Sequence, residues 1–232
     1  MTMLKTNENG RSMIEMLGVL AIIGVLSVGG IAGYSKAMNK FKTNKVADNV
    51  SMLVANIKTM YAQQKTYGGL TTTTANDMGL VPDELVKKSG NATSYKNAFN
   101  GNVAIQSSNS TAATGNDNKA FIIVFDGLSR EACITLATND WGSGFSSGLI
   151  ALRAQGTASI TASGETITVA DLATKIGDAG TGPTAATGGN AGGSAIATPG
   201  SDGLTVPMPV SSAATACGCT QGNTCSITWK YY

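Results

Sequence analysis

Residues 7–30 have the sequence NENGRSMIEMLGVLAIIGVLSVGG, in which a short polar segment leads into a long apolar run. From residue 16 to residue 35 no side chain carries a charge. As a helix this segment would extend roughly 30 Å, about the thickness of the hydrocarbon core of a bilayer. The apolar part of a secretory signal peptide is usually shorter, about 7–15 residues. The stretch therefore predicts a helix that can span a membrane, with one acid, Glu15, directly before it.

The apolar pattern continues past residue 35 but narrows to one face. Apolar side chains recur there at the spacing of a helical stripe: Val46, Val50, Leu53, Val54, Ile57 and Tyr61. The polar side chains among them are expected largely on other faces: Lys45, Asp48, Asn49 and Lys58. No proline occurs before Pro82. We therefore predict one helix from about residue 12 to about residue 64, first apolar all round and then amphipathic.

The composition argues against an enzyme. Only 13% of the 232 residues are charged, and there is no histidine, which removes the commonest general base and the commonest metal ligand. No phosphate-binding loop, nucleophile elbow or framed carboxylate pair occurs. The formal net charge of +2 gives no strong field for nucleic acid. We expect no catalytic residue, no cofactor, no bound metal and no specific nucleic-acid site.

Glu15 calls for an explanation of its own. A carboxylate costs up to about 2.5–3.5 kcal/mol at the centre of a bilayer and less near the interface, so an acid there usually has a function and a partner. A cleaved signal peptide, cut after Ala32, does not explain the glutamate. A plain membrane anchor does not explain it either.

The segment GRSMIE, residues 10–15, followed by an uncharged helix, resembles the class III signal of type IV pilins and pseudopilins. The resemblance implies that a prepilin peptidase cuts between Gly10 and Arg11 on the cytoplasmic side and leaves the apolar helix in place. It also implies N-methylation of the new amino terminus at Arg11. In a filament that amine would neutralise Glu15 of a neighbouring subunit and fix the axial register. The family usually has Phe or Met where this chain has Arg11, and the added charge bears on both cleavage and methylation.

Glycines interrupt the apolar helix near its end. Gly29 and Gly33 form a G-x-x-x-G pair that permits close helix approach, and Gly30 lies between them. Each costs a helix about 1 kcal/mol relative to alanine. Type IVa pilins usually carry a proline in this zone, where this chain has Ala32. We predict that residues 28–34 are the soft spot of the helix, able to stretch in a fibre; the alternative is a continuous straight helix in the free subunit.

The rest of the chain has the pattern of a small α+β domain. A helix capped by Ser129 is expected to turn Ala132, Cys133, Leu136 and Ala137 to one side. Residues 177–203, rich in Gly, Ala and Thr, are expected to form a surface loop. Strands are expected at residues 102–107, 120–126, 147–154, 165–169 and 225–232.

These elements predict an α+β fold in which an antiparallel sheet lies on the amphipathic half of the long helix. Their order resembles that of the type IVb pilins. The segments that carry this resemblance are GLVPDELV, NAFNGNVAI and GLSREACITLA. The resemblance implies a pilin fold, and within the type IVb pilins the chain is most similar to a major pilin.

Four cysteines follow the apolar helix: Cys133, Cys217, Cys219 and Cys225. If that helix leads the chain out of the cytoplasm, disulfides are expected. Cys217 and Cys219 could bond to each other only in a small strained ring. We therefore expect one of them to bond Cys225 and the other Cys133, without deciding which. A four-thiolate zinc site is the less favoured alternative, because the C-x-C spacing is tight and Cys133 stands alone.

The predicted organisation is a leader (1–10), a transmembrane and filament-core helix (11–35), an amphipathic continuation (36–64) and an α+β head (65–232). The predicted function is that of a structural subunit of a type IV pilus, serving adhesion, aggregation, motility or DNA transfer. Its partners would be other copies of itself, the prepilin peptidase and the pilus assembly machinery. It would reside in the bacterial inner membrane before assembly and in the extracellular pilus afterwards. The alternatives are a type II secretion pseudopilin and a secreted disulfide-bonded binding module.

Overall fold

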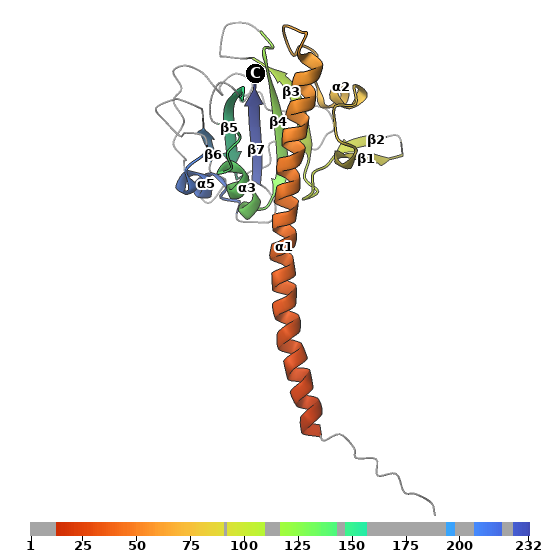
Figure 1. Cartoon of the computed structure of the whole chain (residues 1–232), viewed down its shortest axis with the longest axis vertical. Coiled ribbons are helices and arrows are strands. Elements are labelled where there is room, and N and C mark those ends of the chain that lie inside the picture. Colours follow the sequence, from red (N-terminus) through yellow and green to blue (C-terminus); the bar gives the residue numbers. More distant parts are fainter. Residues whose placement is uncertain are drawn as a thin grey trace, which may run out of the picture. The chain divides into compact units, whose positions relative to one another are not determined.

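The computed structural model describes residues 13–90, 92–109, 117–142, 147–156, 194–197, 207–219 and 225–232. Its contacts divide the chain into two compact units, residues 1–41 and residues 42–232, which we describe separately. Helix α1 (Met13–Tyr61) begins in the first unit and ends in the second (Figure 1). The predicted long helix is thus present, with an end three residues earlier than expected.

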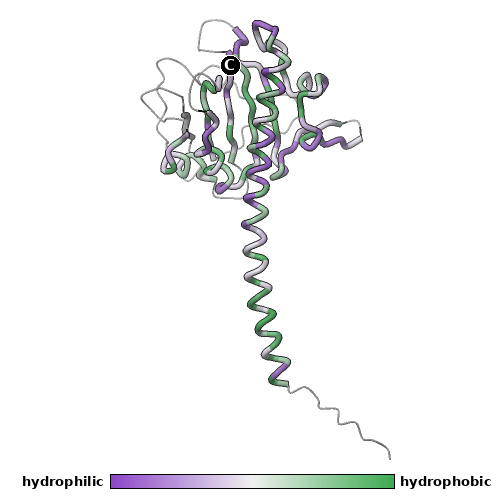
Figure 2. Tube along the Cα trace, in the orientation of Figure 1, coloured by the Kyte–Doolittle hydropathy of each residue, from purple (hydrophilic) through white to green (hydrophobic). Residues whose placement is uncertain are grey.

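In the first unit, α1 is apolar along most of its length and exposed on every side. Figure 2 shows the hydrophobic colour running along this part of the helix. The side chains of Leu17, Val25 and Ile31 are 60%, 75% and 71% exposed. The helix is continuous through residues 28–34, and its glycines have no atom of another segment within 4 Å of where a Cβ would stand. The predicted softness of this stretch stays a prediction.

In the second unit, α1 buries a single stripe. Its buried residues recur at spacings of three and four: Thr43, Val46, Asn49, Val50, Leu53, Ile57 and Tyr61. The predicted apolar stripe is confirmed, with Val54 half-buried at its margin. The expectation for Asn49 is wrong, because its position three residues after Val46 and four before Leu53 places it inside the stripe.

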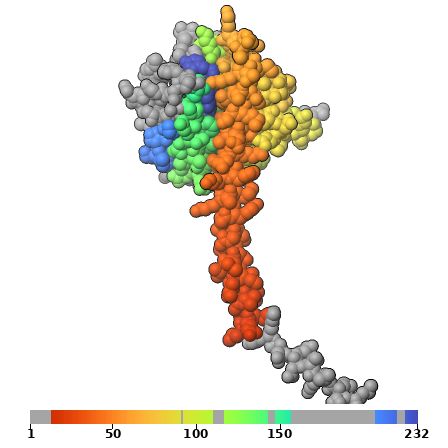
Figure 3. All heavy atoms as spheres, viewed as in Figure 1, coloured from red at the N-terminus to blue at the C-terminus, as the bar shows by residue number. Residues whose placement is uncertain are grey.

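The stripe packs in the same core as one face of a five-stranded sheet. All neighbouring strands are antiparallel. The spatial order is β3-β4-β7-β5-β6. Their bounds are β3 (Val103–Ser108), β4 (Ala120–Leu128), β5 (Leu149–Gln155), β6 (Ser194–Ala197) and β7 (Cys225–Tyr231). Figure 3 shows the face of the head on which α1 lies, between β1 (Val86–Ser89) and β2 (Ala92–Tyr95) on one side and β5 on the other. The predicted α+β class, a long helix on an antiparallel sheet, is confirmed.

The last strand of the chain occupies the middle of the sheet. β7 pairs with β4 through Phe121↔Tyr231 and with β5 through Leu152↔Trp229 (Figure 1). Its predicted alternation is present, because Ile227, Trp229 and Tyr231 belong to the core shared with α1. The residues between them are buried as well, so both faces of this central strand are covered.

Short elements connect the helix to the sheet. Their bounds are α2 (Thr72–Asp77), the 3₁₀ helix η1 (Asp83–Leu85), β1 (Val86–Ser89) and β2 (Ala92–Tyr95). Thr71 caps α2: its hydroxyl accepts from the Thr74 amide at 3.2 Å, and the Thr74 hydroxyl accepts from the Thr71 amide at 2.7 Å. The sequence did not predict the β1–β2 hairpin, because its strands are short and mostly exposed.

A polar turn precedes β3. The buried Asn97 amide donates to the Asp126 carbonyl at 2.7 Å, and its carbonyl accepts from the Phe99 and Gly101 amides at 2.8 and 3.2 Å. Asp126 in turn accepts from the Asn102 amide. A Cβ at Gly101 would overlap the backbone at Asp126, so glycine is required there. This turn fixes where β3 begins beside β4.

Two helices complete the described head, α3 (Arg130–Ala137) and α5 (Val210–Ala216). The Ser129 hydroxyl accepts from the Ala132 amide at 3.2 Å, so the predicted cap of α3 is confirmed. The buried side of α3 consists of the predicted set, Ala132, Cys133, Leu136 and Ala137. Helix α5 was missed, because it is a short run of Ser, Ala and Thr.

A second sequence-based expectation, after that for Asn49, is also wrong. Residues 194–197 lie within the stretch expected to be a loop, but they form β6, which pairs with β5 through Leu152↔Ala197. The hydrogen-bonding edge of β5, distant in sequence, supplies a partner that local composition does not reveal. Several other predictions lie outside the described residues: the leader, Gly10, Arg11, the strand at 165–169 and the remainder of 177–203.

Candidate assembly helix and disulfide framework

The first candidate functional surface is the exposed apolar part of α1, residues 13–35. Large apolar side chains cover it on all sides: Met13, Ile14, Met16, Leu17, Val19, Leu20, Ile22, Ile23, Val25, Leu26, Val28, Ile31 and Tyr34. An apolar surface of this extent is typical of a membrane or protein contact. By length and composition, α1 is able to cross a membrane. The surface can therefore be covered by lipid or by other helices.

Glu15 lies in the first turn of α1, where the helix dipole favours a negative charge. No described residue forms an ion pair with it. The nearest basic residue in sequence, Arg11, lies outside the described residues. Glu15 is therefore a carboxylate at one end of an apolar rod, available to a cation supplied from elsewhere.

The second candidate is the framework of cysteines in the head. Cys133 on α3 bonds Cys217 at the end of α5, with Cα atoms 5.8 Å apart and a sequence separation of 84 residues. Cys219 bonds Cys225 at the start of β7, with a Cα distance of 5.5 Å and a separation of 6 residues. Two disulfide bonds were predicted and are present; of the two arrangements left open, Cys217 takes Cys133 and Cys219 takes Cys225. A disulfide sulfur is not a thiolate, so in this state the cysteines do not form the alternative zinc site.

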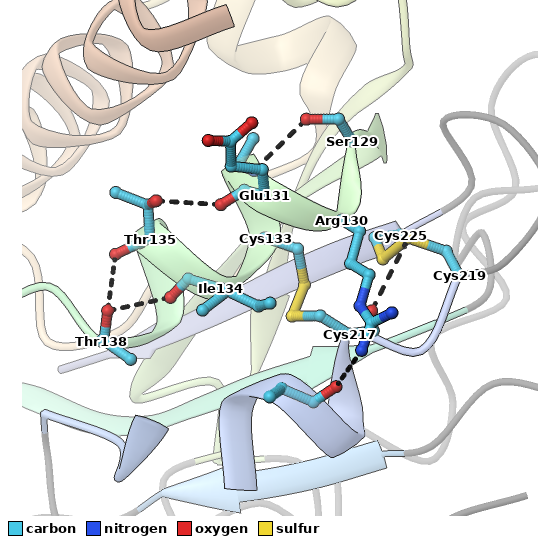
Figure 4. Close-up of a disulfide and its surroundings, with 12 residues drawn as sticks. Ser129, Arg130, Glu131, Cys133, Ile134, Thr135, Thr138, Cys217, Cys219 and Cys225 are labelled. Atoms are coloured by element: carbon cyan, nitrogen blue, oxygen red, sulfur yellow. Dashed lines mark hydrogen bonds between the residues drawn. A yellow bond between two sulfur atoms is a disulfide. The ribbon is translucent and has the colours of Figure 1, made fainter. Parts of the chain in front are cut away.

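The long disulfide fastens the segment around α5 against α3. Non-covalent contacts reinforce the same junction: the Met208 amide donates to the Ala137 carbonyl at 3.2 Å, and the Arg130 guanidinium donates to the Ala214 carbonyl at 3.4 Å. Figure 4 shows the disulfide bridging from α3 to Cys217, with Arg130 extending from the start of α3. The segment around α5 is thus bonded covalently to a helix 84 residues earlier in the sequence.

A third arrangement joins α1 to the chain end. The Lys58 ammonium donates to the Ser147 carbonyl at 2.8 Å and lies 5.1 Å from the centre of the Tyr231 ring. The Tyr232 amide donates to the Gly148 carbonyl at 2.8 Å. The φ of +71° at Gly148 favours glycine, and a Cβ there would also displace the flexible end of the Lys58 side chain.

Burial perturbs two of these groups. Loss of hydration lowers the pKa of Lys58 below its ordinary value. Burial raises the pKa of Tyr231 well above its ordinary value of 10.0. Sequence reasoning placed Lys58 away from the buried stripe and gave it no role. Its hydrogen-bond partner Ser147 is 89 positions away and Tyr231 is further still, so the local pattern holds no signal for either contact.

Comparison with known proteins identifies the family of this chain. The family model described as PilS N terminal matches residues 40–181, more than half of the chain. The major structural subunit of bundle-forming pilus from Escherichia coli O127:H6 is 27% identical over 138 residues, covering 60% of this chain and 68% of that protein. The toxin coregulated pilin of Vibrio cholerae is 33% identical over 139 residues, covering 58% of this chain and 59% of that protein.

A solved structure is also similar: TcpA, a type IV pilin from Vibrio cholerae El Tor biotype, has a TM-score of 0.49 and 22% identity, covering 82% of this chain and 99% of that chain. The family assignment rests on the family model. The chain belongs to the PilS family of type IV pilins. Its role is therefore that of a pilin subunit, and one of the relatives that it matches is named as the major structural subunit of a pilus.

Proposed function

We propose that this chain is a structural subunit of a type IV pilus filament, held in the membrane and then polymerised through the first part of α1. The observation that carries the proposal is the exposed apolar surface of residues 13–35, which has no covering within the described chain. The relatives named as a major pilus subunit and a toxin coregulated pilin support it.

The cost of exposing apolar side chains to water explains why this surface suits both the membrane-held subunit and the subunit in the fibre. Burying an exposed Leu or Ile side chain away from water stabilises by about 1.5–3 kcal/mol, so this helix requires an apolar environment. Lipid tails are about as apolar as leucine, and transfer from membrane to fibre core therefore yields little hydrophobic gain. The preference for the fibre over the membrane therefore has to come from close packing and polar interactions. Glycines 29, 30 and 33 leave room for close packing, and Glu15 supplies the polar interaction.

In this proposal, prepilin peptidase cuts between Gly10 and Arg11 and the new amino group pairs with Glu15 of an adjoining subunit. A carboxylate and an ammonium that are each costly in an apolar medium are then neutralised together, at one axial position. Residues 1–10 form the leader, 11–35 the fibre core, 36–64 the amphipathic continuation and 65–232 the head. The subunit resides in the inner membrane before assembly and in the extracellular pilus afterwards, and the assembly machinery moves it between them.

The test compares two acids on the same helix. Glu15→Gln removes the charge at the apolar end, whereas Asp48→Asn removes a charge from an exposed position in the amphipathic continuation. We expect Glu15→Gln to insert and fold normally but to give far fewer sheared fibres, and Asp48→Asn to give the normal yield. Equal fibre yields from the two variants would contradict the role of Glu15.

The amino-terminal sequence of the membrane-extracted protein separates the proposal from its alternatives. A start at Arg11 supports processing by prepilin peptidase. A start near Gly33 would mean removal of the whole apolar helix and a secreted binding module instead. A pseudopilin would share the start at Arg11 but would depend on a secretion system rather than on a pilus operon for assembly into fibres.

A further inference from the structure

The two disulfides lie close enough to react with each other. The sulfur atoms of Cys133, Cys217 and Cys225 all lie within 4.8 Å of one another, although Cys225 belongs to a different disulfide from the other two. All three residues are fully buried, at 0% exposure. Figure 4 shows the three sulfurs gathered between α3, the end of α5 and the start of β7. Three rigid elements therefore hold this arrangement in place.

Sulfur atoms this close together can exchange disulfide partners. A thiolate attacks a disulfide sulfur, forms a new S–S bond and expels the other sulfur as a thiolate, so the number of disulfides and the redox state do not change. A Cys225 thiolate could attack Cys133 and release Cys217, or attack Cys217 and release Cys133. No oxidant or external thiol is needed once Cys225 is unpaired.

We propose that Cys225 is an internal thiol–disulfide exchange residue, and that its bond to Cys219 guards the Cys133–Cys217 bond against rearrangement. The short disulfide closes a loop of only a few residues, so it restricts the unfolded chain much less than the long one does. Its further role is to keep paired the Cys225 sulfur, which lies within 4.8 Å of both sulfurs of the long bond.

Rearrangement would change what holds the head together. A Cys133–Cys225 bond would join α3 directly to β7, which already lies beside it in the core. The covalent link from α3 to the end of α5 would be lost, leaving contacts such as the one between Met208 and Ala137. The Cys219–Cys225 disulfide thus preserves the Cys133–Cys217 bond, which holds the α5 segment against α3. This inference is independent of whether the chain forms fibres.

The test uses the full chain, purified in detergent, as three variants. Cys219→Ser frees Cys225, Cys225→Ser frees Cys219, and the double variant removes both. Each is incubated at about pH 8.5, near the ordinary pKa of a thiol, then alkylated and mapped by mass spectrometry without reduction. We expect Cys219→Ser to accumulate Cys133–Cys225 or Cys217–Cys225 pairs, about tenfold more than the corresponding Cys219 pairs in Cys225→Ser, because Cys225 is the nearer sulfur. The double variant should retain Cys133–Cys217 alone.

Two results would overturn the proposal. One is Cys219→Ser keeping Cys133–Cys217 intact beside a free Cys225. The other is equal rearrangement in both single variants, which would remove the distinction between the two sulfurs.

Should circular dichroism show that Cys219→Ser is unfolded, the folded wild-type chain provides the second measurement. Brief treatment with a limiting amount of phosphine reductant yields species with a single disulfide, trapped by alkylation over time. Pairs of Cys225 with Cys133 or Cys217 support exchange. Single-disulfide species that retain only the two native pairs would refute it.

Discussion

Residues 13–41 and residues 42–61 belong to one helix but are built for different surroundings. Leu26 in the first part is 68% exposed, whereas Leu53 in the second is fully buried. Both parts are rich in apolar residues, but the first distributes them on every side and the second confines them to a stripe. Among the described residues, the first part therefore has no apolar partner, whereas the second packs in the core that it shares with the sheet.

The largest effect that separates these regions is expected from the long disulfide. Replacing Cys133 and Cys217 together by Ser should lower the free energy of unfolding of the head by about 4–5 kcal/mol, against about 2 kcal/mol for the Cys219 and Cys225 pair, since the first closes the longer loop. Urea unfolding followed by tryptophan fluorescence measures both. Membrane insertion, tested by carbonate extraction, should be unchanged in either variant. A variant that loses insertion would show that the helix depends on the head.

Leucine truncation compares the two parts of the helix directly. Leu53→Ala leaves a cavity in the core and should cost the head about 2–5 kcal/mol. Leu26→Ala, on an exposed position of the same helix, should change that stability by less than about 0.5 kcal/mol. The same urea titration reports on both. Comparable losses from the two would mean that residues near 26 share the core of the head.

The stability of the head at alkaline pH depends on the buried Tyr231. Because burial raises the pKa of Tyr231 above 10.0, the folded chain retains a proton that the unfolded chain releases. The stabilisation is therefore complete below pH 10 and is lost as the pH rises above it, by about 1.4 kcal/mol per pH unit. Lys58, with its lowered pKa, contributes the opposite slope and is present in every variant.

Unfolding free energies at about pH 9, 10 and 11 test this linkage. Tyr231→Phe should reduce the alkaline loss by the contribution of one proton. Identical slopes for wild type and Tyr231→Phe would argue against this origin.

The smallest effect is expected from the ion pair of Lys45 and Glu84, which links α1 to η1 at 2.5 Å. Both side chains are about 40% exposed, so solvent screens the pair. Lys45→Ala should cost at most about 1 kcal/mol, and the difference should shrink in high salt. Lys40→Ala, at an exposed position earlier on the same helix, serves as the control. A cost above that of Leu53→Ala would reveal a structural role that exposure does not suggest.

Much of the architecture followed from local pattern. The change from an all-round apolar run to a stripe identified both parts of α1, and Val46, Val50, Leu53 and Ile57 are buried as their spacing required. Ser129 as a helix cap, the buried run of β4 and the two disulfides were also readable, because each depends on neighbours close in sequence or on a small set of pairings. The cleavage site at Gly10 and the role of Glu15 remain predictions from the same stretch.

Other features depended on segments distant in sequence. β6 formed because β5 offered an edge, and Asn49 was buried because the sheet covers that side of α1. Lys58 acquired its carbonyl partner from Ser147, and Cys217 rather than Cys219 reached Cys133. Periodicity predicts which side of a helix is apolar, but it does not predict which strand or loop will lie against it.

By itself, the sequence determined that this protein has a membrane-length apolar helix, an amphipathic continuation, an α+β head and paired cysteines. Those properties follow from hydrophobic periodicity, caps and composition, which act over a few residues. Tertiary structure alone decided that the last strand lies in the middle of the sheet and that Cys225 lies beside a disulfide to which it does not belong. The physical reason is that strand pairing and core packing join residues separated by a hundred positions, where close-packed shape and backbone hydrogen bonding select the neighbour.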